Sequence, residues 1–216
     1  MLPRARTPTR IPTLIAGLHG VCNPPEYACG YWVGAAAERG LLVCPTGNSR
    51  CNAASYHAPT WTEPVAAMDA DLEAAIAATA ARFPALVAPA EERRGAVLFG
   101  FSKGAYAAVK IAQAHPGRWP YLVLAEADVA LDPTALRAAG VRAVGLLAGE
   151  FSPAHRGERR TVAALERAGF PARLWVMRRA GHYYSADIDA LMAEALDFVL
   201  SVNADAPGPA ARLQAS

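Results

Sequence analysis

One serine near the middle of the chain lies in a setting that suits a nucleophile. Ser102 stands in GFSKG, which fits the pattern G-x-S-x-G. An apolar segment, GAVLF, precedes the motif, and an alanine-rich segment with helical character follows it. On a sharp turn from a strand to a helix, small neighbours leave room for a nucleophile in a strained conformation. The helix N-terminus would also favour the negative charge that develops there. The alternative is a serine that only caps the helix, and the flanking segments favour the nucleophile.

One histidine late in the chain has the position of a general base. His182 lies in RRAGHYYS, directly after the last apolar segment. An imidazole titrates near neutral pH, so it can accept and return the proton of a serine hydroxyl. The alternative is an ordinary histidine of a surface loop. His57, His115 and His155 are weaker candidates, because they lie in a polar loop, at a helix end and after a proline.

These two residues need a scaffold that brings distant segments together. Short apolar segments typical of buried strands occur at residues 13–18, 41–45, 95–100, 121–129, 142–149 and 172–177. Helical segments alternate with them at residues 31–40, 63–83, 103–115, 132–140, 156–169 and 185–202. This alternation predicts an α/β domain with a mostly parallel central sheet of about six or more strands and helices on both faces. Ligands bind beyond the carboxyl ends of such strands, where Ser102 and His182 fall.

The 216 residues fit one domain better than two. We expect a flexible lead-in over residues 1–11, a single domain over 12–202 and a disordered tail over 203–216. The formal net charge is +2, and the arginines are scattered without interleaved aromatic residues, so no nucleic-acid partner is expected. No apolar run reaches the roughly 18 residues that a membrane span needs.

The cysteines lie in the first quarter of the chain and form two pairs with equal seven-residue offsets. They are Cys22, Cys29, Cys44 and Cys51. Disulfides are favoured because most of the surrounding sequence is polar and loop-like, but the sequence leaves three pairings open. Free thiols and, less so, a zinc site are the alternatives, although no C-x2-C spacing is present. Disulfides would indicate a secreted or periplasmic protein whose signal was removed; otherwise we expect a cytoplasmic one.

The order of these motifs resembles the α/β-hydrolase superfamily. The order is strand, LHG, strand, CPTG, helix, GFSKGA and a late GH, over about residues 12 to 200. The chain is most similar to compact carboxylesterases, feruloyl esterases and polyhydroxyalkanoate-depolymerase-like serine hydrolases. The resemblance implies that Ser102 is the nucleophile and His182 the base. It also implies that the N–H groups of Val21 and Lys103 form the oxyanion hole, and that no cofactor is needed.

The sequence departs from this family at the third member of the triad. After the fifth strand the family usually has G-x-x-D, whereas this chain has GEFS and therefore Ser152 at the acid position. A serine cannot supply the buried negative charge that orients the imidazole. We predict that Asp128, beyond the fourth strand, is the acid, with Glu150 as the alternative and Glu126 as a third choice. A dyad enzyme or an inactive relative would also explain the departure.

The sequence thus predicts a serine hydrolase that cleaves carboxylic esters through an acyl-enzyme, on a small-molecule or polymer substrate. The segment between the fourth and fifth strands is too short for a large lid, so we expect an open cleft. Aromatic residues for an acyl or aromatic subsite are Tyr27, Trp32, Tyr56, Trp61, Tyr183 and Tyr184, each of which also suits packing. The alternatives are a peptidase or amidase on the same scaffold and a non-catalytic binding protein.

Overall fold

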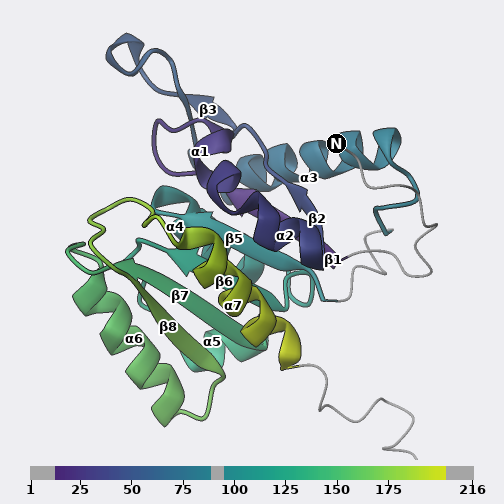
Figure 1. Ribbon diagram of the computed structural model, residues 1–216. Coiled ribbons are helices and arrows are strands. Elements are labelled where there is room, and N and C mark those ends of the chain that lie inside the picture. Colours follow the sequence, from purple (N-terminus) through teal and green to yellow (C-terminus); the bar gives the residue numbers. More distant parts are fainter. Residues whose placement is uncertain (1–12, 89–94, 203–216) are drawn as a thin grey trace, which may run out of the picture.

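A central sheet of parallel strands organises the chain, with helices on both of its faces (Figure 1). The computed structural model describes residues 13–88 and 95–202. The strands are β1 (Thr13–Leu18), β2 (Gly40–Val43), β5 (Val97–Phe101), β6 (Tyr121–Ala125), β7 (Ala143–Gly149) and β8 (Ala172–Met177). Their order is β2-β1-β5-β6-β7-β8, and every neighbouring pair is parallel. The predicted α/β fold is confirmed. The predicted lead-in and tail, residues 1–11 and 203–216, lie outside the described residues.

The helices form two layers, each joined to the sheet by its own apolar cluster. One layer contains α3 (Val65–Arg82), α4 (Lys103–Ala114), α5 (Pro133–Ala138) and α6 (His155–Arg167). The other contains α1 (Pro25–Cys29), the 3-10 turn η1 (Gly30–Trp32), α2 (Val33–Arg39) and α7 (Ile188–Ser201). Along β5, Leu98 packs in the first cluster, while Val97 and Phe99 pack in the second. Successive side chains of a strand point to opposite faces, so a sheet covered on both sides needs continuous apolar strands.

A small hairpin projects from the carboxyl end of the sheet (Figure 1). It pairs β3 (Ser49–Arg50) with β4 (Pro59–Thr60), and the 3-10 turn η2 (Ala53–Ser55) lies between them. The sequence predicted only a polar, turn-rich loop over residues 46–62. It also missed α1, because a five-residue helix that begins at a proline leaves no periodic pattern. Both elements belong to the loops around the carboxyl ends of β1 and β2.

Two disulfides fasten these loops. Cys22 is bonded to Cys51, which joins the segment after β1 to the hairpin. Cys29 is bonded to Cys44, which joins the end of α1 to the segment after β2. The prediction of disulfides is thus confirmed, and the structure selects one of the three open pairings. Disulfides are typical of proteins from oxidising compartments. Among the described helices, none is long and apolar enough to cross a membrane.

Candidate active site

Ser102 occupies a sharp turn between β5 and α4. Its backbone has φ 52° and ψ −119°, a strained conformation for a residue with a side chain. A Cβ atom at Gly104 would lie 2.2 Å from the carbonyl oxygen of Leu18, and one at Gly100 would lie 2.4 Å from that of Gly104. Both glycines of the motif are therefore required by close backbone packing. The Ser102 hydroxyl makes no capping hydrogen bond to α4, which argues against the capping interpretation.

His182 lies in the loop after β8 and contacts the serine directly. Its Nε2 is 2.9 Å from Ser102 Oγ, and its Nδ1 is 3.1 Å from Glu126 Oε2. Because a carboxylate accepts hydrogen bonds, Nδ1 carries the proton and Nε2 is left to accept from the hydroxyl. The imidazole packs against Phe101, with 5.4 Å between the ring centres, and about half of it is exposed. The site is therefore open to solvent on the side of the serine.

Glu126 is the carboxylate that contacts His182. It is the first residue after β6, has φ 60°, and its side chain is fully buried. Its Oε1 accepts from the Gly149 N–H, and its Oε2 accepts from Ser152 Oγ as well as from His182. Burial raises the pKa of Glu126, and the hydrogen bonds from Ser152, Gly149 and His182 oppose that rise. Three converging donors thus support a negative charge beside the imidazole.

This geometry corrects the predicted position of the acid. Asp128, the predicted acid, is more than half exposed and lies 4.0 Å from Arg160 on α6. Glu150, the alternative, accepts from the backbone N–H of Arg179 at 3.0 Å. Neither side chain contacts His182 in the described structure. The β6 strand ends at Ala125, so the first residue beyond it faces the imidazole and the third turns toward α6. One sequence signal was present, because Glu126 directly follows its strand as Ser102 follows β5.

Ser152 explains the departure from the family pattern. It stands at the position where the family has its acid, and its hydroxyl donates to Glu126 Oε2 at 2.5 Å. The same hydroxyl accepts from the Ala154 N–H at 3.2 Å. In this chain, therefore, the loop after β7 supplies a hydrogen-bond donor to a carboxylate that comes from the neighbouring strand. The departure gives no support to a non-catalytic protein.

The LHG segment packs against the turn that carries the serine. A Cβ atom at Gly20 would lie 3.4 Å from Ser102 Cβ, which places the segment beside this serine. His19 is fully buried, and its ring nitrogens lie 2.8 Å from the Gly20 carbonyl oxygen and 3.0 Å from that of Thr46. These contacts anchor the segment that follows β1 to the segment that follows β2. Lys103 begins α4, so its N–H has no partner within the helix. The donors predicted at Val21 and Lys103 stay a prediction.

An aromatic cluster of Tyr27, Tyr31, Phe101 and Tyr184 lies beside His182. Tyr27 is 5.5 Å from Phe101 and 5.5 Å from Tyr184, measured between ring centres. Tyr31 completes the cluster at 5.6 Å from Tyr184 and is 56% exposed, so it offers a free ring face. Among the other predicted subsite residues, Trp32 and Trp61 are fully buried, and Tyr56 is almost fully exposed near the tip of the hairpin.

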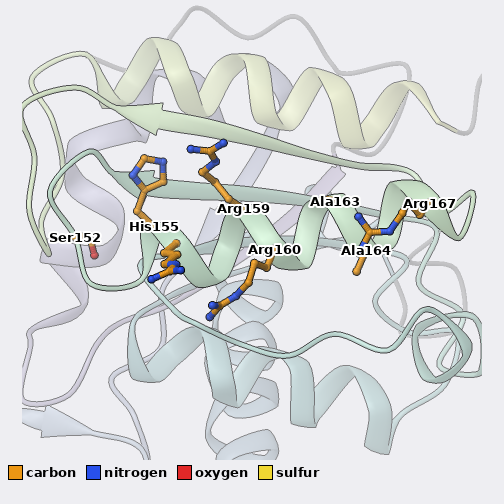
Figure 2. A pocket seen from close by; sticks show the side chains of 8 residues that line it. Ser152, His155, Arg159, Arg160, Ala163, Ala164 and Arg167 are labelled. Carbon is orange, nitrogen blue, oxygen red and sulfur yellow. The ribbon is translucent and has the colours of Figure 1, made fainter.

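A cavity of about 770 Å³ lies along α6 and is not lined by Ser102 (Figure 2). Its lining residues are Ser152, His155, Arg156, Arg159, Arg160, Ala163, Ala164 and Arg167. Figure 2 shows Ser152 near one end of the helix and Arg167 at the other. Ser152, whose hydroxyl donates to Glu126 Oε2, is the lining residue that connects this cavity to the hydrogen-bonded group of Ser102, His182 and Glu126.

Comparison with known proteins places this geometry in a familiar fold. No protein-family model matches the sequence, and no curated protein is similar to it in sequence. Among solved structures, the chain is similar to esterase PE8, with TM-score 0.63 and 19% identity over 88% of this chain and 93% of that one. It is also similar to the Bacillus cereus carboxylesterase, with TM-score 0.59 and 15% identity over 89% of each chain. A fluorophosphonate-binding serine hydrolase of Staphylococcus aureus matches with TM-score 0.57 and 14% identity over 92% of this chain and 87% of that one. The chain has the α/β-hydrolase fold.

Proposed function

We propose that this protein is a serine hydrolase that cleaves carboxylic esters through an acyl-enzyme intermediate. One observation carries the proposal: Ser102, His182 and Glu126 form a continuous chain of hydrogen bonds in the order that nucleophilic catalysis requires. The strained turn at Ser102 and the names of the similar structures, which are esterases and serine hydrolases, support it.

The chemistry follows from the donor and acceptor directions. His182 Nε2 takes the proton of Ser102 Oγ while Oγ attacks the acyl carbon, and Glu126 stabilises the imidazolium that forms. The N–H groups of Val21 and Lys103 bind the oxyanion, each contributing about 3 kcal/mol to the transition state. The imidazolium then protonates the leaving alcohol, which departs and leaves the acyl group on Oγ. A water molecule, deprotonated by His182, releases the acid and restores the serine.

The surroundings of the triad define the substrate and compartment that we propose. The imidazole is half exposed, so the site suits a small-molecule ester or the accessible end of a polymer. The aromatic cluster beside His182 suits an aromatic or acyl group of that ester. Because two disulfides fasten the loops near the site, we propose that the protein works in an oxidising compartment, secreted or periplasmic.

The test is covalent labelling by a fluorophosphonate together with hydrolysis of p-nitrophenyl acetate. We expect stoichiometric labelling of Ser102 and ester turnover, both abolished in Ser102→Ala. Ser201→Ala is the matched control, since that exposed serine ends α7 and its hydroxyl donates to the Phe198 carbonyl oxygen of the same helix. Wild-type protein that is folded yet neither labels nor hydrolyses the ester would overturn the proposal. Faster hydrolysis of p-nitroacetanilide than of the ester would point to an amidase.

A further inference from the structure

A second carboxylic acid is buried behind the loop that carries Glu126. Glu158, on α6, is 1% exposed. Its Oε1 accepts a hydrogen bond from the backbone N–H of Ala127 at 2.7 Å, and Ala127 is the residue that follows Glu126. The proposed mechanism gives Glu158 no task. Its one strong contact, however, is with the backbone that determines where Glu126 points.

Helix α6 is pressed against this loop along its first two turns. A Cβ atom at Gly157 would lie 1.8 Å from Asp128 Oδ1, so the first turn of the helix lies directly against the Asp128 side chain. Thr161, one turn beyond Glu158, donates to the carbonyl oxygen of Val129 at 3.1 Å. Two side chains of α6 thus bind the loop over residues 127–129, and Glu158 is the one that binds next to Glu126.

The number of donors decides which of the two buried carboxyl groups carries the charge. Glu126 accepts from three donors, one of them the imidazole. Glu158 accepts from one, and its Oε2 has no partner among the described residues. Burial raises the pKa of Glu158 to about 9, and the nearby charges of Glu126 and Asp128 add to the rise. At neutral pH Glu158 is therefore an uncharged acid, and of these two carboxyl groups the three donors favour the negative charge on Glu126.

We propose that Glu158 is a positioning residue for catalysis, which holds the Ala127 N–H and thereby keeps the Glu126 carboxylate directed at His182. Glu126 has φ 60°, a conformation that a residue with a side chain keeps only when its surroundings hold it. The Ala127 N–H is the next backbone group along the chain, so its hydrogen bond fixes the orientation of the peptide that follows this strained residue. The inference rests on the proposed ester hydrolysis.

The first test compares Glu158→Gln, Glu158→Ala and Thr161→Val, with kcat expressed per site titrated by the fluorophosphonate. Glu158→Gln keeps an oxygen for the Ala127 N–H, and we expect its kcat to stay within about twofold of wild type. Glu158→Ala leaves that N–H buried and unpaired, and we expect kcat to fall about tenfold or more at nearly constant KM. Thr161→Val is the control, because it loosens the same loop farther from Glu126, and its kcat should stay within about threefold of wild type.

Three outcomes would overturn the inference. Glu158→Ala that is less stable but keeps wild-type kcat per titrated site would make Glu158 merely structural. An equal loss of kcat in Thr161→Val would assign the effect to general loosening of α6. Wild type that neither labels nor hydrolyses esters would overturn the proposed function and this inference together. If wild type hydrolyses esters normally while the variants give either of the first two outcomes, only the inference about Glu158 fails and the proposed function stands.

A second test needs no catalysis and examines the charge of Glu158. Between the ordinary value of 4.5 and about 9, the folded chain keeps a proton at Glu158 that the unfolded chain has released. Its contribution to stability therefore falls as pH rises, by up to about tenfold in the folding equilibrium constant per pH unit. The charged groups that face Glu158 are Glu126 and Asp128, whose own partners are His182 and Arg160. All four are present in wild type and in Glu158→Gln, so comparing these two proteins isolates the titration of Glu158. Glu158→Gln should gain stability relative to wild type from pH 5 to 9, measured by denaturant unfolding. A difference in stability between the two proteins that stays constant from pH 5 to 9 would show that Glu158 is not an uncharged acid in the folded chain.

Discussion

Replacement of Glu126 by glutamine separates the roles of the nearby carboxylates. The variant Glu126→Gln is expected to lower kcat for p-nitrophenyl acetate by about 10⁴-fold, with little change in KM. This loss corresponds to about 5.4 kcal/mol of transition-state stabilisation. The fold should persist, because the amide has almost the same shape and removes a buried charge whose desolvation is unfavourable.

The size of the loss follows from the donors that surround the carboxylate. The amide has one oxygen, and that oxygen must face Gly149, whose peptide N–H can only donate. The amide nitrogen then faces Ser152 and His182 Nδ1. The Ser152 hydroxyl can rotate to accept, but Nδ1 can accept only if the ring proton moves to Nε2. In that tautomer, Nε2 cannot take the proton of Ser102.

The assay is steady-state hydrolysis at neutral pH, with the rate of fluorophosphonate labelling as a second readout of serine reactivity. Circular dichroism confirms that each variant is folded. Asp128→Asn and Glu150→Gln are the matched controls, since each removes one carboxylate that does not contact His182. Both should stay within about threefold of wild type, as surface substitutions do. The reasoning is refuted if Glu126→Gln keeps more than a tenth of wild-type kcat, or if either control loses more activity than Glu126→Gln.

Three further predictions follow from single contacts. Ser152→Ala removes one donor from Glu126, so the pKa of Glu126 should rise further and kcat/KM should fall about tenfold, more steeply at mildly acidic pH, in a pH–rate profile. Tyr31→Ala should raise KM for naphthyl acetate about two- to tenfold and leave kcat unchanged, because the variant removes an exposed ring of the aromatic cluster. Replacing both Cys29 and Cys44 by alanine opens a loop that spans 15 positions and should lower the free energy of unfolding by about 3 kcal/mol in urea titrations.

The sequence predicted the fold well because the sheet is covered on both faces. Each strand must then be apolar throughout, so β5 and β6 stand out as short continuous runs between amphipathic helices. The same pattern marks the carboxyl ends of the strands, which is why Ser102 and His182 could be selected from sequence. Both residues lie just beyond the end of a strand, and the change from an apolar run to polar residues marks that end in the sequence.

The acid and the disulfide pairing depend on relations that no local pattern records. Whether Glu126 or Asp128 faces the imidazole is decided by the backbone at Glu126, which has φ 60° and lies between hydrogen bonds to α6 and to the end of β7. The partner of Cys29 is decided by which loops meet above the sheet, and the parallel pairing of β1 with β2 brings the segment that carries Cys44 to the same edge. Both depend on tertiary contacts between segments that are distant in the sequence, which local patterns do not specify.

Strand register explains how Glu126, after β6, can take the place of a carboxylate in the loop after β7. Ala125 pairs with Leu147, so Glu126 lies across from the end of β7, next to Gly149. The family pattern places its carboxylate in the loop after β7, where this chain has Ser152. Here the carboxylate comes from β6, and the loop after β7 contributes the Gly149 N–H and the Ser152 hydroxyl that hold it. The imidazole requires a stabilised negative charge at a point in space and not an aspartate at a point in the sequence. Two adjacent parallel strands end at that point, so either can supply the charge if the other supplies the donors.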